Sequence, residues 1–244
     1  MLSSRSLSKH FDGVVAADGV SIEIGAGERV GLIGSNGAGK TTFVNMVTGY
    51  LKPDSGSIVV DGRDVTALGP RAIMRLGVAR SFQIPQLCAE MSVLDNMLMA
   101  EVCGSENLSW FKAFKTPEKI EQAKSILERF AIAEHAKRRV AELPGGVRKL
   151  LDIALALTAK PKLLLLDEPT SGVSVEEKFP LMDTVMAALE GASTTILFVE
   201  HDMEVVTRYA GRVVAFYSGR VLADGAPATV LSDADVRRHV TGSA

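Results

Sequence analysis

Short apolar runs alternate along this chain with segments in which apolar residues recur at every third or fourth position. The runs typical of β-strands are residues 29–33, 57–60, 77–82, 163–166, 194–199 and 212–217. Residues 163–166 and 194–199 look apolar on both faces, as parallel strands covered by helices are. A helical pattern over residues 41–48 follows the first run directly. This alternation predicts an α/β fold, a mostly parallel sheet covered by helices.

The middle of the chain, residues 92–158, has a helical pattern instead. One apolar stripe begins behind Thr116-Pro117, where proline suits the first turn of a helix, and a second begins behind Gly145-Gly146. The stripes consist of Ile120, Ala123, Leu127 and Phe130, and of Leu150, Ile153, Ala154 and Leu157. The expected division is a single domain, residues 1–244, with a sheet core of residues 1–85 and 160–244 and an inserted helical lobe of residues 86–159.

Local signals mark turns and helix ends. Asp61-Gly62 and Ser218-Gly219 predict tight hairpin turns. Ser174 and Glu177 match a capping box that opens a helix. Because proline removes a helical hydrogen bond, Pro180 predicts a kink in that helix or a later start.

Composition narrows the class of protein. The 244 residues are 47% hydrophobic and 23% charged, an ordinary globular composition that excludes disorder, collagen-like repeats and coiled coils. A formal net charge of −2 provides no strongly basic field to collect nucleic acid. The N-terminus lacks the apolar stretch of a secretory signal, and no segment approaches the ~18 apolar residues of a membrane span. We therefore expect a cytosolic protein whose membrane role comes through a partner.

The chain has two cysteines, Cys88 and Cys103. Two are too few for a disulfide framework or a cysteine-rich zinc site. We expect both to be small buried hydrophobic residues in a reducing compartment.

A glycine-rich segment after the first predicted strand carries the strongest chemical signal. Residues 34–41, Gly-Ser-Asn-Gly-Ala-Gly-Lys-Thr, match the phosphate-binding pattern G-x-x-x-x-G-K-[ST]. Such a loop needs glycine because its backbone N–H groups must turn toward the phosphates, and the helix behind it adds about half a positive charge. Lys40 would reach the β- and γ-phosphates, and the Thr41 hydroxyl would ligate Mg²⁺. The alternative is a plain glycine turn between a strand and a helix.

Polar residues follow two of the buried strands at the edge of the sheet where ligands of open α/β sheets bind. Asp167 suits an Mg²⁺ contact through water, and Glu168 can orient or deprotonate an attacking water. His201 would hydrogen-bond the γ-phosphate or that water, and Gln83 offers an amide oxygen to the metal or the water. The plainer alternatives are a strand-end acid pair facing solvent and a structural histidine.

Together these segments resemble the nucleotide-binding subunits of ABC transporters over nearly the whole chain. The resemblance implies a P-loop NTPase (RecA-like) α/β core, an N-terminal antiparallel β layer and an inserted helical lobe, with ATP and Mg²⁺ as cofactors. The nucleotide contacts that it implies are Phe11, Gly34, Ser35, Asn36, Gly37, Ala38, Gly39, Lys40, Thr41, Thr42, Gly145 and Gly146. It also implies metal contacts from Thr41, Gln83 and Asp167, and catalytic roles for Glu168, His201, Gln83 and Lys40. Phe11 matches the aromatic residue that stacks on adenine, and a core aromatic residue is the alternative.

Residues 143–147, Leu-Pro-Gly-Gly-Val, match the family's signature, usually Leu-Ser-Gly-Gly-Gln. In the family its glycines contact the γ-phosphate bound to the opposite subunit, so that two subunits close around two ATP molecules. Pro144 and Val147 replace the serine and the glutamine, and Ser174 stands where the family has an aspartate in the dimer-facing loop. These departures concern contacts across the pair, not nucleotide binding itself.

Within the family, residues 7–11, 80–83 and 199–203 look like those of branched-chain amino acid importers. This implies an ATPase that works as a homodimer, or as a heterodimer with a second ATPase subunit. Its other partners would be transmembrane permease subunits and, indirectly, a solute-binding protein, at the inner face of the cell membrane, and no nucleic acid. Urea, amide and lipopolysaccharide transport ATPases share much of this pattern. A non-transport ABC ATPase acting on ribosomes or DNA, and a regulatory nucleotide-binding module, stay open as alternatives.

Overall fold

The computed structural model describes residues 1–104 and 115–242. The chain divides into two compact units, residues 1–78 together with 193–244, and residues 79–192. The helical lobe expected at residues 86–159 falls inside the second unit, and its residues 105–114 lie outside the described part of the chain. The second unit also takes in two strands and one helix that the sequence analysis assigned to the sheet core.

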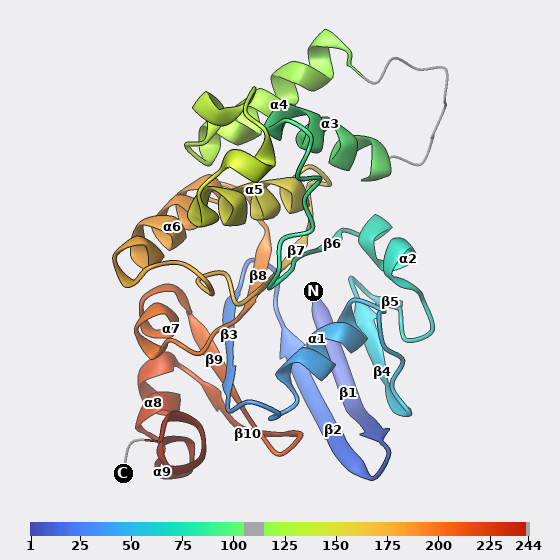
Figure 1. Ribbon diagram of the computed structural model, residues 1–244. Helices are drawn as coiled ribbons and strands as arrows, with labels where there is room; N and C mark the ends of the chain where they lie inside the picture. The colour runs from blue at the N-terminus through green and yellow to red at the C-terminus, as the bar shows by residue number, and fades with distance from the viewer. Residues whose placement is uncertain (105–114, 243–244) are drawn as a thin grey trace. The chain divides into compact units, whose positions relative to one another are not determined.

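An antiparallel sheet in the first unit has the strand order β2–β1–β4–β5 (Figure 1). Its strands are β1 (Leu2–Phe11), β2 (Val14–Ile24), β4 (Ser55–Val60) and β5 (Arg63–Asp64). β1 and β2 pair along their length, from Leu2 opposite Ile24 to Phe11 opposite Val14. β4 turns into β5 through Asp61-Gly62. Both the expected β layer and the expected turn are therefore confirmed.

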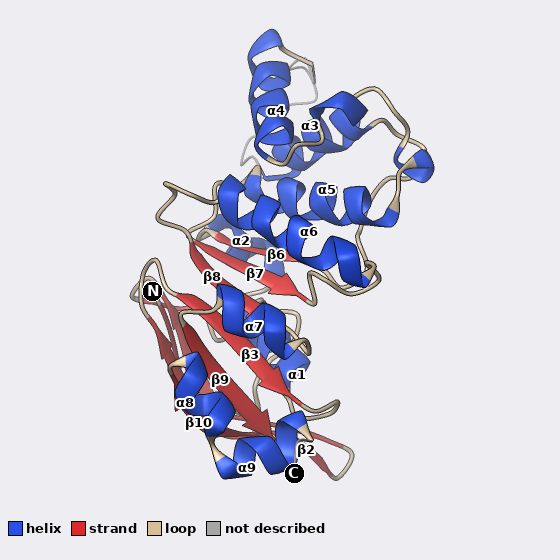
Figure 2. Ribbon diagram, turned by 90° about the vertical axis from the view of Figure 1, so that its left-hand side faces the viewer, coloured by secondary structure: helices blue, strands red, loops and turns tan. Residues whose placement is uncertain are grey.

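The first unit also contributes four neighbouring strands to a second sheet, in the order β10–β9–β3–β8. They are β3 (Arg29–Gly34), β8 (Thr195–Val199), β9 (Arg212–Tyr217) and β10 (Arg220–Gly225). β3 runs parallel to β8 and to β9, and β9 returns as β10 through the expected turn at Ser218-Gly219. The carboxyl ends of three parallel strands therefore meet at one edge, as Figure 2 shows for β8, β3 and β9.

The helices of the first unit are α1 (Lys40–Val47), α2 (Pro70–Arg75), α7 (Met203–Tyr209), α8 (Pro227–Ser232) and α9 (Ala234–Val236), and a π-helical turn follows (Arg237–Thr241). α1 is anchored by Phe43, which is fully buried with its ring centroid 5.7 Å from that of Phe216 on β9. α7 packs on β3, where Gly31 leaves room for Val206 and Ala210 (Figure 2). These contacts cover the sheet on both sides of β3, which carries the predicted phosphate loop.

The second unit contains the strands β6 (Val78–Ser81), which begins at the boundary between the units, and β7 (Leu163–Asp167). Its helices are α3 (Val93–Gly104), α4 (Pro117–Arg129), α5 (Gly145–Leu157) and α6 (Val175–Ala188), with 3-10 turns at Ala133–His135 and Val140–Glu142. α4 begins at Pro117, as expected, and the Thr116 hydroxyl caps it by accepting a hydrogen bond from the Lys119 N–H at 3.3 Å. Leu127 and Phe130 of the first stripe and Ile153 and Ala154 of the second are buried.

Two expectations for α6 need correction. The helix begins at Val175, directly after Ser174, but the Ser174 side chain makes no capping hydrogen bond. The helix also runs through Pro180 to Ala188, so the later start is wrong. An isolated proline costs one helical hydrogen bond, and the buried apolar face of α6, which includes Leu181 and Val185, continues past it.

Cys88 is exposed, so the expectation that it is buried is wrong. It lies in the irregular segment between β6 and α3, where its N–H donates to the Asn96 side chain at 2.9 Å. Such connecting segments run over the surface, because their backbone groups need water or side-chain partners. The side chain of Cys103 lies outside the described part of the chain.

The described helices are short. α6, the longest of them, has 14 residues, whereas a bilayer-spanning helix needs about 20. Within residues 1–104 and 115–242, no helix combines the length and the apolar character needed to cross a membrane.

Candidate functional site

The loop between β3 and α1 turns so tightly that it has no room for side chains at two positions. Gly34 and Gly39 have φ angles of 153° and 105°. A Cβ at Gly34 would lie 2.6 Å from the Phe216 carbonyl oxygen, and one at Gly39 would lie 2.5 Å from the carbonyl oxygen of Ala16 on β2. Only glycine fits both positions, because real Cβ atoms do not approach backbone oxygen so closely.

Lys40 folds back over this loop. Its side chain is buried, and its Nζ donates to the carbonyl oxygens of Gly34 at 2.6 Å and Ser35 at 3.0 Å. The turn is closed by the Ala38 N–H, which donates to the Ser35 carbonyl oxygen at 3.1 Å. An ammonium group and the N-terminus of α1 therefore lie at the same place, which is a combination that attracts anions.

The tip of the loop is open to solvent while its base is fixed. Ser35, Asn36, Gly37 and Thr41 are exposed, and Thr42 is half-buried. The base is supported by the turn between β9 and β10, where the Gly219 N–H donates to the Ala38 carbonyl oxygen at 3.0 Å. The predicted loop residues are thus one continuous structure with an accessible tip.

Phe11 lies at the end of β1 and is 45% exposed, so the alternative reading as a core aromatic residue is wrong. It pairs with Val14 on β2, and Val14 and Val15 are 65% and 44% exposed. The same strand contacts the glycine loop through Ala16. The strand pair that carries these exposed apolar side chains therefore also contacts the loop.

His201 follows β8, the strand that pairs with β3. Val199 is opposite Leu32, and the Glu200 N–H donates to the Leu32 carbonyl oxygen at 3.2 Å. The His201 N–H donates to the carboxylate of Glu200 at 3.2 Å, and the His201 side chain is exposed. The first unit therefore brings the loop and His201 to the same edge of its sheet.

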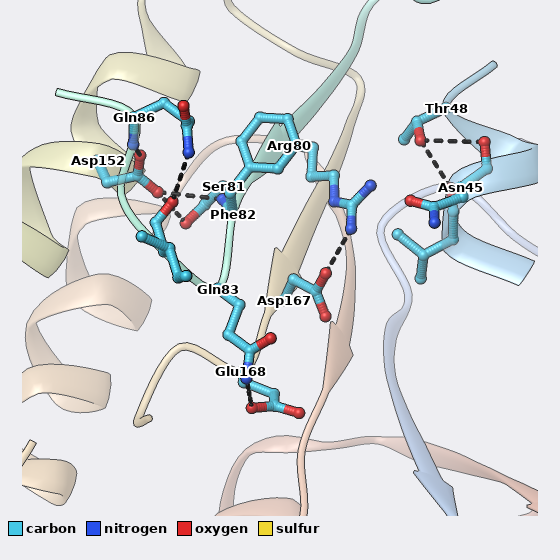
Figure 3. Close-up of polar contacts among 12 residues, drawn as sticks. Asn45, Thr48, Arg80, Ser81, Phe82, Gln83, Gln86, Asp152, Asp167 and Glu168 are labelled. Carbon is cyan, nitrogen blue, oxygen red and sulfur yellow. Dashed lines mark hydrogen bonds and ion pairs between the residues drawn. The ribbon is translucent and has the colours of Figure 1, made fainter. Parts of the chain in front are cut away.

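In the second unit, Asp167 ends β7 with its carboxylate buried. The Arg80 guanidinium on β6 forms an ion pair with it at 2.5 Å (Figure 3). Arg80 also lies 4.8 Å from the ring centroid of Phe82. Buried charges of this kind are costly unless paired, and the Arg80 guanidinium is the partner of the Asp167 carboxylate in this ion pair. Arg80 was not among the predicted site residues, and the signal for it in the sequence is a cation three residues before Gln83.

Glu168 and Gln83 are in direct contact. The Gln83 Nε2 donates to the Glu168 Oε2 at 2.5 Å, as the dashed line in Figure 3 marks. Glu168 has a φ of 48°, which is uncommon for a residue with a side chain. Such strain occurs where the surrounding structure holds a functional group in place. Two predicted residues from different segments are thus brought together, next to Asp167.

Gly145 and Gly146 begin α5, directly after Pro144, which makes no side-chain capping bond. Neither glycine has a positive φ. Among the described residues, a Cβ at Gly146 would meet nothing within 4 Å, and one at Gly145 would come no closer than 3.8 Å to another atom. Larger side chains would fit at both positions in the described part of the chain, because there is open space beside the start of α5.

Two charged residues of α5 were missed by the sequence analysis. Lys149 and Asp152 are 3% and 6% exposed, although they lie on a helix with an apolar stripe. Burial raises the pKa of Asp152, while hydrogen bonds from Ser81, Gln86 and Phe82 and the Lys149 ammonium act against that rise. The available signal was two opposite charges one turn apart within an otherwise apolar segment.

The predicted metal ligands have the chemistry of a magnesium site. Among the described residues, no three histidine, cysteine or acidic side chains are grouped so that they could hold a metal ion. Thr41, Gln83 and Asp167 supply a hydroxyl, an amide and a carboxylate oxygen. Mg²⁺ prefers such oxygen ligands, takes only one or two carboxylates, and completes its shell with water and substrate phosphates. The oxygen atoms of these three residue types are therefore of the kind that Mg²⁺ prefers.

Because the loop lies close to β2 at Gly39 but not at Gly37, alanine at these two positions should lower the stability of the protein by different amounts. Gly37→Ala places its Cβ in open space at a φ of 78°, so it should lower the free energy of unfolding by about 1–2 kcal/mol from backbone strain alone. Gly39→Ala adds a clash with Ala16 and should cost clearly more. Urea unfolding of the two nucleotide-free variants measures the difference, and equal losses would contradict the geometry.

Comparisons with known proteins show which family the chain belongs to. The ABC transporter family profile matches residues 17–171. The high-affinity branched-chain amino acid transport ATP-binding protein LivG of Salmonella typhimurium is 36% identical, over 100% of this chain and 98% of the relative. The corresponding protein BraF of Pseudomonas aeruginosa is 33% identical over the same shares of both chains.

Solved structures give the same result. The ADP conformation of MJ1267, an ATP-binding cassette of an ABC transporter, has a TM-score of 0.86 at 34% identity, and the match covers 98% of this chain and 97% of that one. The expected P-loop fold with its antiparallel layer is thereby confirmed. From the family profile and from relatives along its whole length, the chain belongs to the ABC transporter family, as one of its ATP-binding ATPase subunits.

Proposed function

We propose that this chain binds ATP with Mg²⁺ and hydrolyses it to drive the import of branched-chain amino acids through separate membrane subunits. The observation that carries the proposal is the Lys40 ammonium, held over the glycine loop at the end of a parallel strand. The two carbonyl oxygens are neutral acceptors, whereas the phosphates of a nucleotide are charged ones. A polyphosphate would therefore form stronger, charge-assisted hydrogen bonds with this ammonium.

Nucleotide binding would use the first unit. Residues 34–42 would surround the phosphates with backbone N–H groups, and Lys40 would exchange the carbonyl oxygens of Gly34 and Ser35 for the β- and γ-phosphates. Phe11 would stack on the adenine ring with its exposed face. His201 would hydrogen-bond the γ-phosphate from the neighbouring strand.

Hydrolysis would depend on Glu168. Its carboxylate would accept the proton of the attacking water, and the hydrogen bond from Gln83 would keep the carboxylate in one orientation. Mg²⁺, when bound, would neutralise charge on the phosphates, with oxygen atoms of Thr41, Gln83 and Asp167 as its protein ligands. Arg80 would hold the Asp167 carboxylate in one orientation for this role.

The transported solute is inferred from the relatives. LivG of Salmonella typhimurium and BraF of Pseudomonas aeruginosa are named for branched-chain amino acid transport. Residues 7–11, 80–83 and 199–203 carry the same resemblance in this sequence. Urea and amides are the competing solutes, since their transport ATPases share much of this pattern.

The working unit would be a pair of such subunits on the inner face of the membrane, held there by permease subunits. The open space at Gly145 and Gly146 supports the pair, because no contact within the part of the chain that the structure describes accounts for two glycines at that helix start. A γ-phosphate bound to the opposite subunit would account for them. Whether the second ATPase subunit is another copy or a different chain would not change this contact.

Replacement of the proposed base separates hydrolysis from binding. We expect the purified chain to hydrolyse ATP in the presence of Mg²⁺, and Glu168→Gln to lower kcat about 10²–10⁴-fold, which is the usual contribution of a general base. Affinity for ATP should change little, and the variant should collect as ATP-bound dimers in size-exclusion chromatography. Equal rates in the two proteins would remove Glu168 from the mechanism, and an inactive wild type with bound ATP would favour a regulatory module.

The solute is tested with the assembled transporter in proteoliposomes. With its permease subunits and solute-binding protein present, leucine, isoleucine or valine should raise ATP hydrolysis, because the loaded binding protein favours the closed pair. Urea and acetamide serve as controls and should leave the rate unchanged. Stimulation by urea or acetamide, and not by leucine, would contradict the proposed solute class.

A further inference from the structure

Lys149 holds the main chain of the segment that carries Gln83. Its buried Nζ donates to the carbonyl oxygens of Phe82 at 3.1 Å and of Gln83 at 3.0 Å. These carbonyl groups follow the end of β6, so they lie outside the strand that would otherwise bond them. Backbone oxygen that is partly shielded from water needs a partner, and the Lys149 ammonium is a partner for both.

Asp152 binds the same segment by accepting hydrogen bonds from its hydroxyl and N–H groups. Its Oδ2 accepts from the Ser81 hydroxyl at 2.6 Å and from the Phe82 N–H at 3.2 Å, and its Oδ1 accepts from the Gln86 N–H at 3.3 Å (Figure 3). With Lys149, five hydrogen bonds therefore join two side chains of one helix turn to residues 81–86. We call these two side chains the α5 clamp.

The α5 clamp is costly in a way that stability alone does not explain. Burial of both charges carries a desolvation penalty, and well-packed apolar residues often replace such groups without loss of stability. Leu151 and Ile153, the apolar neighbours of Asp152 in α5, are fully buried. What the charges add is geometry, because each fixes a particular carbonyl or N–H group in one position.

The α5 clamp links two parts of the site. α5 begins with Gly145-Gly146, and Lys149 follows one turn later on the same rigid helix. Lys149 binds the backbone of Gln83, and the side chain of the same Gln83 donates a hydrogen bond to Glu168. A shift of α5 would thus move the backbone of Gln83, and with it the bond that orients Glu168.

We propose that Lys149 and Asp152 are positioning residues that fix Gln83 to the signature helix, so that contact at Gly145-Gly146 and the orientation of Glu168 change together. The inference rests on the proposed function for its kinetic consequence, but the fixing of residues 81–86 does not.

The test removes the ammonium while keeping the side-chain stem, with Lys149→Met, and applies the same substitution to exposed Lys137 as a matched control. Hydrogen exchange of peptides spanning residues 81–88 should be faster by about tenfold or more in Lys149→Met, as expected for the loss of charge-assisted hydrogen bonds, and unchanged in Lys137→Met. kcat for ATP should fall about tenfold while KM for ATP stays within about twofold. Asp152→Asn, which keeps the shape and one acceptor, is the second variant if Lys149→Met fails to fold, and should give smaller effects in the same direction.

A double-mutant comparison separates positioning from a general loss of structure. In a Gln83→Ala background, Lys149→Met should lower kcat by less than about twofold, because the residue that it positions is already absent. A full tenfold loss in that background, or wild-type exchange of residues 81–88, would overturn the α5 clamp. If Gln83→Ala and Glu168→Gln both hydrolyse ATP at the wild-type rate, the proposed function fails instead, while the exchange result still decides the clamp.

Discussion

The glycine loop approaches its neighbours so closely that two of its positions have no space for a side chain, and the proposed chemistry depends on that approach. Gly34 lies against the backbone of β9, and Gly39 lies against the backbone of β2. The loop is therefore fixed by main chain on two sides before any ligand binds. This is what places the Lys40 ammonium and the start of α1 together at the carboxyl edge of the sheet.

Much of the local structure follows from the sequence because local interactions decide it. The turns at Asp61-Gly62 and Ser218-Gly219, the helix start at Pro117 and the strand–loop–helix around Lys40 all depend on residues within a few positions of one another. Pro180 shows the limit of that reasoning. A local penalty predicted a kink or a later start, but the helix begins at Val175, since packing of the apolar face of α6 outweighs one lost hydrogen bond.

The site was predictable only in part, since its supporting charges have partners far away in the chain. Asp167 and Arg80 are 87 residues apart, and Asp152 and Ser81 are 71 apart. No periodicity or spacing links such pairs, so Arg80, Lys149 and Asp152 read as ordinary charged residues. Phe11 and Cys88 show the same limit for exposure, because a residue's type does not say whether its segment ends at the surface.

The central claim is that a lysine-capped loop of backbone N–H groups binds the phosphates of a nucleotide. The most direct measurement is the affinity of wild type and Lys40→Ala for ATP and for AMP by isothermal titration calorimetry. The account predicts that Lys40→Ala weakens ATP binding about tenfold or more, as a lost charge-assisted bond of 1.5–3 kcal/mol requires, and leaves AMP binding unchanged because AMP lacks the β- and γ-phosphates. Undiminished affinity for ATP would contradict it.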